Sequence, residues 1–297
     1  MSRRALARHS RGMSETFPLP GSADAVVAAP APGQGPQFWA GAPSAVLDAD
    51  GTIVVGYRVR NGPDTTDETV VARSRDGERL ETVLVLDQDH FGAQWTERPA
   101  LVRLDTGWRM YVSCATPDTK HWWVGVLDAP TLEALGDAEV RTAVAGDAAT
   151  AVNDPVVRVQ DGVWHAWVCC HLLDLPGEED RMNSAYATSA DGLDWDWHGT
   201  VLEGRHGEWD ARGARLTAIL PDGRAAYDGR ASAEENWFER IGLALPDGGR
   251  CVSTGDARFD ARYLEVLPLP DGSYRIYYEA RLPDESHELR TELISDI

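Results

Sequence analysis

Short hydrophobic runs alternate with polar turns along most of the chain, and five of these turns end in glycine in the same setting. Each turn follows an apolar stretch and precedes a second run rich in β-branched and aromatic residues, a pattern that predicts β-hairpins. The turns end at Gly51, Gly107, Gly162, Gly223 and Gly272. A recurrence every 50 to 60 residues or so, with about four short strands in each interval, is typical of the blades of a β-propeller.

We therefore predict an all-β chain that folds as a five-bladed β-propeller. The blades should cover residues 37–90, 94–146, 150–205, 209–256 and 260–297. Because the last interval holds only three strands, we expect residues 24–29 to add its outer strand and close the ring. The alternative is a loose segment beside a three-stranded last blade. Residues 1–21 are expected to be a disordered leader, or else a targeting arm, before a single domain at 22–297.

The acidic balance narrows the possible partners. The formal net charge is −20, which disfavours nucleic acid and anionic membranes, and no apolar run is long enough for a transmembrane helix. The four cysteines lack the spacing of metal ligands. We expect a reduced, cytoplasmic, monomeric protein that uses no cofactor and no metal, and that acts on a small molecule.

The candidate catalytic and binding residues are expected at one rim of the predicted propeller. The first strand of a blade begins where its second strand ends, so residues at these points should surround one central pocket. The acids at these points are Glu97, Asp154, Asp228 and Glu279, and the arginines are Arg58, Arg60, Arg98, Arg230 and Arg281. Acids buried in apolar strands need partners. The arginines could therefore orient a substrate, or the two sets could only neutralise one another around the axis.

Further side chains are expected at the same rim. The loop at 171–184 is the longest between the second and third strands of a blade, and long loops are often functional, although a solvated acidic loop is the alternative. It supplies His171, Glu179, Asp180 and Arg181. Trp39 and Trp95 precede two first strands and could stack on a sugar ring, and Tyr278 ends a second strand.

The chain resembles the five-bladed propeller superfamily of arabinanases, xylosidases, invertases and mannoside phosphorylases (glycoside hydrolase families 43, 32 and 130). The resemblance covers about residues 22–297. It rests on the openings Glu97-Arg98-Pro99 and Asn153-Asp154-Pro155, on two Ser-x-Asp-Gly hairpins ending at Gly77 and Gly192, and on Tyr57-Arg58, which is similar to the phosphorylase branch.

The resemblance implies that Glu97 and Asp154 match catalytic carboxylates by position, with Glu279 and Asp228 in reserve. The departure is that blade 1 opens with Gly41-Ala42-Pro43, where the arabinanase type places its general base. Invertases, in turn, place Asn-Asp-Pro in blade 1 rather than in blade 3.

Four functions follow as hypotheses. The first is a glycosidase that uses two carboxyl groups on a small sugar or glycoside. The second is a phosphorylase, or an enzyme for an anionic sugar, because rim arginines suit phosphate and carboxylate. The third is a non-catalytic sugar-binding propeller, and the fourth is a non-glycosidic enzyme of specialised metabolism on the same scaffold.

Overall fold

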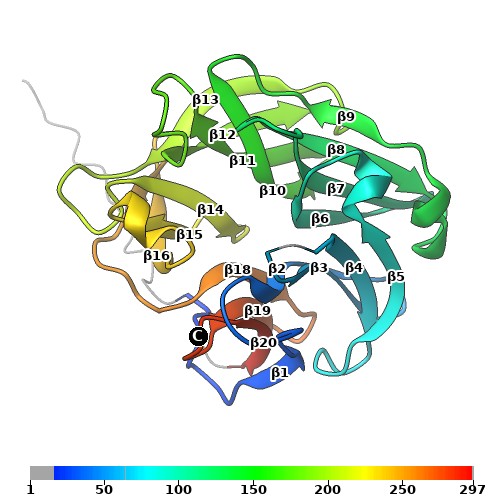
Figure 1. The fold of residues 1–297 in the computed structure, drawn as a ribbon. Coiled ribbons are helices and arrows are strands. Elements are labelled where there is room, and N and C mark those ends of the chain that lie inside the picture. Colours follow the sequence, from blue (N-terminus) through cyan, green and yellow to red (C-terminus); the bar gives the residue numbers. More distant parts are fainter. Residues whose placement is uncertain (1–16, 64, 296–297) are drawn as a thin grey trace, which may run out of the picture.

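The computed structural model describes residues 17–63 and 65–295, and within them every element longer than five residues is a β-strand. The prediction of an all-β chain is confirmed. Among the described residues, three short 3-10 helices lie in the connections, namely η1 (Gln88–Phe91), η2 (Glu133–Asp137) and η3 (Ala233–Glu235). In Figure 1 the first strands of successive groups lie nearest the centre, with later strands toward the outside.

The described strands form three sheets. Within these sheets, consecutive strands pair antiparallel in runs of three or four that we call blades 1 to 5, and single parallel bridges join blade 5 to blade 1 and blade 3 to blade 4. Blade 1 consists of β2 (Phe38–Leu47), β3 (Ile53–Asn61), β4 (Asp67–Ser74) and β5 (Glu81–Asp87). Blade 2 consists of β6 (Thr96–Leu104), β7 (Gly107–Ala115), β8 (Trp122–Ala129) and β9 (Arg141–Val144). Blade 3 consists of β10 (Thr150–Gln160), β11 (Val163–Leu172), β12 (Met182–Ser189) and β13 (Asp196–Glu203).

The remaining two blades complete the described chain. Blade 4 consists of β14 (Gly213–Ile219), β15 (Ala225–Arg230), β16 (Arg240–Asp247) and β17 (Arg250–Ser253). Blade 5 consists of β18 (Arg262–Pro268), β19 (Tyr274–Arg281) and β20 (His287–Ile294). No helix in the described part of the chain is long and apolar enough to cross a membrane.

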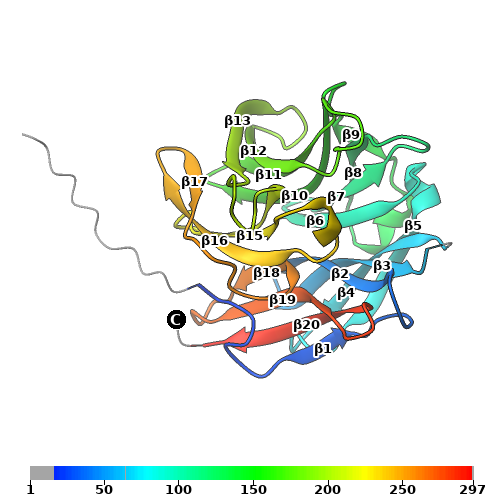
Figure 2. The same ribbon diagram turned by 60° about the vertical axis from the view of Figure 1, so that its left-hand side comes forward.

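A strand from the beginning of the chain lies beside the last strand. β1 (Val26–Ala29) pairs antiparallel with β20, with Val26 opposite Thr291. Figure 2 shows the two strands side by side. The backbone N–H groups of Gly21 and Ala23 donate to the carboxylate of the buried Glu292 at 2.9 and 3.0 Å. The two ends of the described chain are therefore tied together by strand pairing and by one buried acid.

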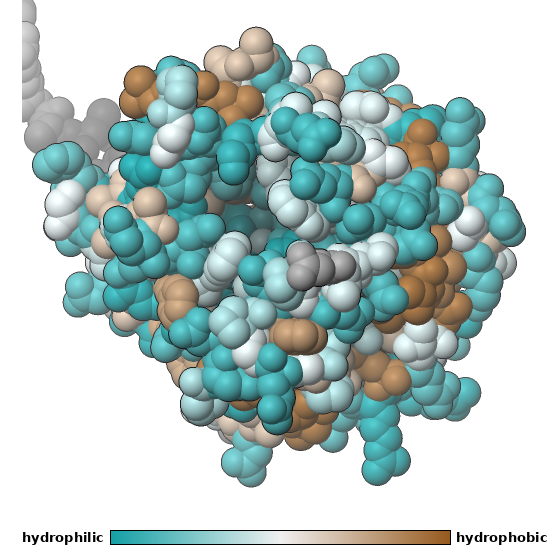
Figure 3. Space-filling view, viewed as in Figure 1, coloured by the Kyte–Doolittle hydropathy of each residue, from teal (hydrophilic) through white to brown (hydrophobic). Residues whose placement is uncertain are grey.

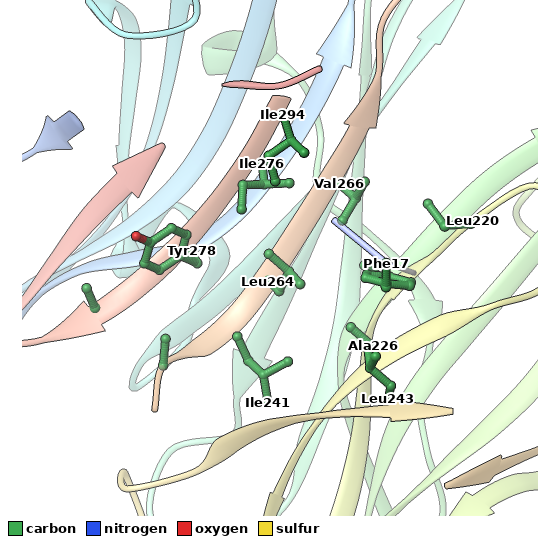
Figure 4. Close-up of a cluster of buried hydrophobic side chains, with 13 residues drawn as sticks. Phe17, Leu220, Ala226, Ile241, Leu243, Leu264, Val266, Ile276, Tyr278 and Ile294 are labelled. Atoms are coloured by element: carbon green, nitrogen blue, oxygen red, sulfur yellow. The ribbon is translucent and has the colours of Figure 1, made fainter. Parts of the chain in front are cut away.

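Phe17 corrects the predicted extent of the leader. Residues 1–16 lie outside the described residues, whereas Phe17 is only 7% exposed and belongs to an apolar cluster between blades 4 and 5. Figure 4 shows it beside Leu220, Ala226 and Leu243. A leader that continues to residue 21 is therefore wrong, because burying an aromatic ring stabilises the segment that carries it. The sequence around Phe17 has no strand pattern that could have shown this.

Replacing Phe17 by Ala is expected to destabilise the protein by about 3–5 kcal/mol, the usual range for removing a buried aromatic side chain. Urea unfolding measures the loss. Val27→Ala is the matched control, because Val27 is in the same N-terminal region but is 45% exposed, and it should change stability little. Equal stability of the two variants would contradict the burial of Phe17.

Candidate functional site

A pocket of about 350 Å³ opens where the first strands begin and the second strands end. Residues from every blade except the first line it, together with side chains from the connections. They are Glu97, Lys120, Trp122, Asn153, His171, Gly177, Glu179, Asp180, Arg215, Arg230, Asn236, Trp237, Glu239, Arg262 and Tyr263. Figure 3 shows that the centre of one face is hollowed and bordered mainly by hydrophilic residues. A pocket of this size suits a small polar ligand.

The first strand of each blade carries a β-bulge or similar irregularity near its beginning, at the rim of the pocket. The pairing register shifts after Gly41, Glu97, Asn153, Leu216 and Arg262. Asp154 and Tyr263, at these bulges, have φ of 49° and 54°. This left-handed conformation costs a residue other than glycine about 1–3 kcal/mol and is enriched at functional sites. The bulges therefore aim selected side chains at the axis at some expense in stability.

One tyrosine hydroxyl joins two carboxyl groups of the site. Tyr263 Oη lies 3.4 Å from Glu97 Oε2 and 3.2 Å from Asp154 Oδ2, and can donate to either. Glu97 lines the pocket with 11% of its side chain exposed, whereas Asp154 is fully buried behind it. The two acids named by position are thus brought together, and of these two only Glu97 lines the pocket.

Arg215 holds the buried side of this cluster. Its two terminal nitrogens donate to Asp154 Oδ2 at 2.8 Å and to Asp228 Oδ2 at 2.7 Å. Its guanidinium also lies 3.9 Å from the centre of the Tyr263 ring. One arginine therefore fixes the position of two buried carboxyl groups and of the tyrosine between them.

Burial has the largest effect on the pKa values of Asp154, Asp228 and Tyr263. It raises the pKa of Asp154, with Arg215 opposing the shift and Glu97 adding to it. Burial likewise raises the pKa of Asp228 against the opposing effect of Arg215, and raises the pKa of Tyr263 well above its usual value. Tyr263 therefore stays a neutral hydrogen-bond donor, and Asp154 holds a proton more readily than an exposed aspartate does.

Glu279 is locked in a different network. Its buried carboxylate accepts from Arg58 Nη2 at 2.6 Å and lies 3.2 Å from Arg262 Nε and 2.5 Å from His287 Nδ1. Burial opposes its ionisation, but Arg262 and Arg58 hold the pKa of Glu279 well below the usual value. A group with this pKa and this many donors remains an anion and does not exchange protons with a substrate.

Gly41 explains why blade 1 contributes no side chain to the pocket. A Cβ atom at residue 41 would lie 2.0 Å from Glu279 Oε2 and 2.4 Å from Glu279 Cγ. The Glu279 side chain therefore fills the space that a side chain at the opening of blade 1 would need.

Glu239 is a pocket acid that two arginines neutralise. It forms ion pairs with Arg230, and with Arg262 at 3.2 Å. Burial opposes ionisation here too, yet Arg262 and Arg230 lower the pKa of Glu239 to about 2. Glu239 therefore acts as a fixed negative charge that positions the two arginines, rather than as a proton donor.

His171 also lines the pocket and lies near the end of β11. Its Nδ1 is 3.1 Å from the backbone oxygen of Glu179. Burial, together with the positive charge of Arg230, lowers the pKa of His171 to about 4, so the imidazole is neutral at neutral pH. A neutral histidine in a pocket can accept or donate one hydrogen bond on each nitrogen.

Several polar atoms around the cluster have no protein partner among the described residues. They are Asn153 Oδ1, Asp154 Oδ1, Arg215 Nε and Arg230 Nε, and all are buried. Leaving such atoms unpaired costs about 1–3 kcal/mol each, so buried water is a natural partner for them. Within the described residues no group of three or more His, Cys, Asp or Glu side chains is arranged to hold a metal ion.

Solved structures with this architecture exist. α-L-arabinofuranosidase from Lactobacillus brevis matches with a TM-score of 0.64 and 14% identity, covering 86% of this chain and 90% of that one. β-1,2-mannobiose phosphorylase from Listeria innocua matches with a TM-score of 0.62 and 12% identity, covering 93% and 92%. This chain has the fold of the β-propeller glycosidases. No protein-family model matches the sequence, and no curated protein matches it.

A third match extends the range of activities found on this propeller glycosidase fold. Sucrose-6-phosphate hydrolase from Lactobacillus gasseri matches with a TM-score of 0.60 and 9% identity, covering 92% of this chain and 61% of that one. The three matched proteins are a furanosidase, a phosphorylase and a sugar-phosphate hydrolase, so the shared fold alone does not select one reaction.

Some rim residues that the sequence indicated do line the pocket of this propeller, and others lie behind it. Glu97, His171, Glu179, Asp180 and Arg230 line it. Asp154, Asp228, Glu279 and Arg58 are fully buried around it, which fits the alternative that buried acids and arginines neutralise one another. Arg60 holds Asp67 at 2.7 Å and reaches Glu97 at 3.3 Å.

The other candidates are held elsewhere. Arg98 is buried below the site, where it pairs with Glu265 at 2.7 Å and donates to the backbone oxygen of Thr217. Trp39 is buried against Trp237 and His287, so its faces are already covered. Tyr278 belongs to the apolar cluster of Figure 4, with its hydroxyl on Glu292.

The last three candidates do not line the pocket. Trp95 is 39% exposed and is not among the lining residues. Arg181 pairs with Asp174 inside its own loop, and Arg281 pairs with Asp260. A stacking face for a sugar ring is offered instead by Trp122 and Trp237, which do line the pocket.

Some of the pocket residues that the sequence analysis did not select could have been found from the sequence, and others could not. Arg215, Arg262 and Tyr263 open first strands, so the rule that found Glu97 could also have selected them. Glu239, Trp237 and Lys120 lie in connections without a motif, and only their placement in space brings them to the pocket.

Proposed function

We propose that this chain is an enzyme that cleaves the glycosidic bond of a small glycoside in the central pocket. The observation that carries the proposal is the Glu97 carboxyl, which faces the pocket and is linked through Tyr263 to a buried carboxyl of raised pKa. A pair of carboxyl groups in different environments is typical of acid–base catalysis. The fold shared with sugar-active enzymes supports the proposal.

In this proposal Glu97 acts on the substrate and Asp154 acts through Tyr263. The Tyr263 hydroxyl is within donating distance of both Asp154 Oδ2 and Glu97 Oε2. When Asp154 is protonated, the first of these hydrogen bonds reverses, so that Asp154 donates to Tyr263 Oη and Tyr263 Oη donates to Glu97 Oε2. The chain of hydrogen bonds supplies Glu97 with the proton that it transfers to the leaving oxygen as the glycosidic bond breaks. Trp122 and Trp237 pack on the sugar ring, and Arg215 and Arg230, which line the same pocket, hold its hydroxyl groups.

A phosphorolytic reaction, or an anionic sugar as substrate, is the second candidate. Lys120, Arg215, Arg230 and Arg262 all face the pocket. Against it, the three arginines already pair with Asp154, Asp228, Glu239 or Glu279. The paired charges favour a neutral sugar, with phosphate as the variable to test.

A panel of small glycosides tests the proposal, with each compound added with and without inorganic phosphate. We expect a rise in melting temperature and release of free sugar for at least one compound. Sugar phosphate formed only when phosphate is present would select the second candidate. Stabilisation without any product would indicate a non-catalytic sugar-binding propeller. No response to any compound would refute the proposal and favour a non-glycosidic reaction.

A further inference from the structure

We propose that His171 is the proton acceptor of this site, taking a proton from the water that attacks the sugar. The inference rests on the proposed function, and on the position of the imidazole in the pocket lined by Glu97, Arg215 and Tyr263. It assigns the role of proton acceptor to a histidine from blade 3.

The hydrogen bond on Nδ1 fixes the tautomer. The partner of Nδ1 is the backbone oxygen of Glu179, which can only accept, so Nδ1 must carry the hydrogen. The lone pair of the neutral ring is then on Nε2. Nε2 has no hydrogen-bond partner among the described residues, so this lone pair is available to a ligand or a water molecule in the pocket.

The charged groups around the His171 imidazole favour its neutral form. The charged groups that face it are Arg230 on β15, Arg215 on β14 and Asp180 in the loop after β11. The two arginines disfavour a third positive charge, and burial adds to their effect more strongly than Asp180 opposes it. A neutral imidazole beside two fixed cations accepts a proton only from a group that becomes acidic during the reaction, such as an attacking water.

Most carboxylates near the pocket are engaged in other interactions. Glu239 and Glu279 are held as anions by arginines that lower the pKa of each. Asp154 and Asp228 are fully buried. Asp180 forms a two-point ion pair with Arg212 at 2.5 and 2.9 Å. Glu179 also lines the pocket, where its Oε1 accepts from the N–H of Gly177 at 2.9 Å. Glu97 serves the leaving oxygen in the proposed reaction. His171 differs from these acids in having its orientation fixed by a hydrogen bond on one ring nitrogen and a free lone pair on the other.

The proton balance of the step is simple. Water oxygen bonds to the anomeric carbon while its proton passes to Nε2 of His171. The bond from the anomeric carbon to the leaving oxygen breaks, and that oxygen receives the proton of Glu97. After the products leave, His171 loses one proton to solvent and Glu97 regains one, so the net reaction is hydrolysis by one water.

Two measurements on the full chain test the inference. The first is nitrogen NMR of the histidines through a pH titration, with His171→Gln used to assign the signal. We expect the Nδ1–H tautomer, still neutral well below the ordinary imidazole pKa of about 6.5. The second uses the glycoside that the wild-type chain turns over fastest. His171→Gln should lower kcat about 10²-fold or more, with a smaller change in KM.

His198→Gln is the matched control, because His198 is exposed on blade 3, bonds only to the side chain of Thr188 and should leave kcat unchanged. His171→Ala should regain part of its activity when imidazole is added, which a purely structural role would not produce.

The outcomes separate this inference from the proposed function. A doubly protonated ring near neutral pH, or hydrogen on Nε2, would overturn the inference even if a glycoside is cleaved. Cleavage that is lost in Glu97→Gln but unchanged in His171→Gln would leave the function standing and remove His171 from it. If the wild-type chain cleaves no glycoside, the proposed function fails and the role of His171 fails with it.

Discussion

Replacing Glu97 by Gln is expected to lower kcat by about 10³-fold, within the range usual for removing a general acid. The amide keeps the size of the side chain and can still accept a hydrogen bond from Tyr263, but it has no proton to transfer. KM should change much less, because the substrate keeps its contacts with the tryptophans and arginines of the pocket. Initial rates on the best glycoside of the panel measure both constants.

Glu203→Gln is the control for this change. Glu203 is an exposed acid on β13 that pairs with Arg250 at 2.8 Å, so its loss should not alter turnover. If Glu97→Gln is folded and retains the wild-type kcat, Glu97 is not the acid, and the proposed link from Asp154 through Tyr263 has no function in the reaction. Circular dichroism and the melting temperature establish whether the variant is folded.

The strands were predictable because their signals are local. Each hairpin carries its own turn and its own apolar runs, and the predicted strand at 24–29 overlaps β1, observed at Val26–Ala29. The rim could also be located, since the direction of each strand follows from the order of the hairpins. The burial of Phe17 could not be predicted, because it depends on an apolar surface formed by blades 4 and 5, which are far from Phe17 in the sequence.

The sequence could not predict which rim residues line the pocket and which are buried behind it, for two physical reasons. Neighbours in a strand face opposite sides, so Glu279 points to an ionic network while Tyr278 points into the apolar cluster. The bulge after Glu97 likewise sends Glu97 to the pocket and Arg98 to Glu265 below it. In addition, ion pairs such as Arg58 with Glu279 join residues 221 positions apart, and no local pattern records such a pairing.

The absence of an acid at the opening of blade 1 has a structural cause that can be tested. Replacing Gly41 by Ala is expected to destabilise the protein by about 3–5 kcal/mol. The new Cβ would overlap the Glu279 carboxyl group at 2.0 Å, a contact that no rotamer of alanine can avoid. Moving Glu279 would separate it from Arg58 and Arg262, and breaking a buried ion pair typically costs this amount. Urea unfolding measures the free energy.

Gly136→Ala is the matched control, because its nearest neighbour would be the flexible end of Leu84 at 3.1 Å. A double-mutant cycle with Glu279→Ala identifies the clash: Glu279→Ala is itself destabilising, but Gly41→Ala should add little once the carboxyl group is gone. If Gly41→Ala is as stable as Gly136→Ala, or if its effect is undiminished without Glu279, the carboxylate does not occupy the space beside residue 41. The absence of an acid at the opening of blade 1 would then need another explanation. If the cycle shows the expected coupling, the acid missing from blade 1 and the buried acid of blade 5 are two consequences of one packing arrangement.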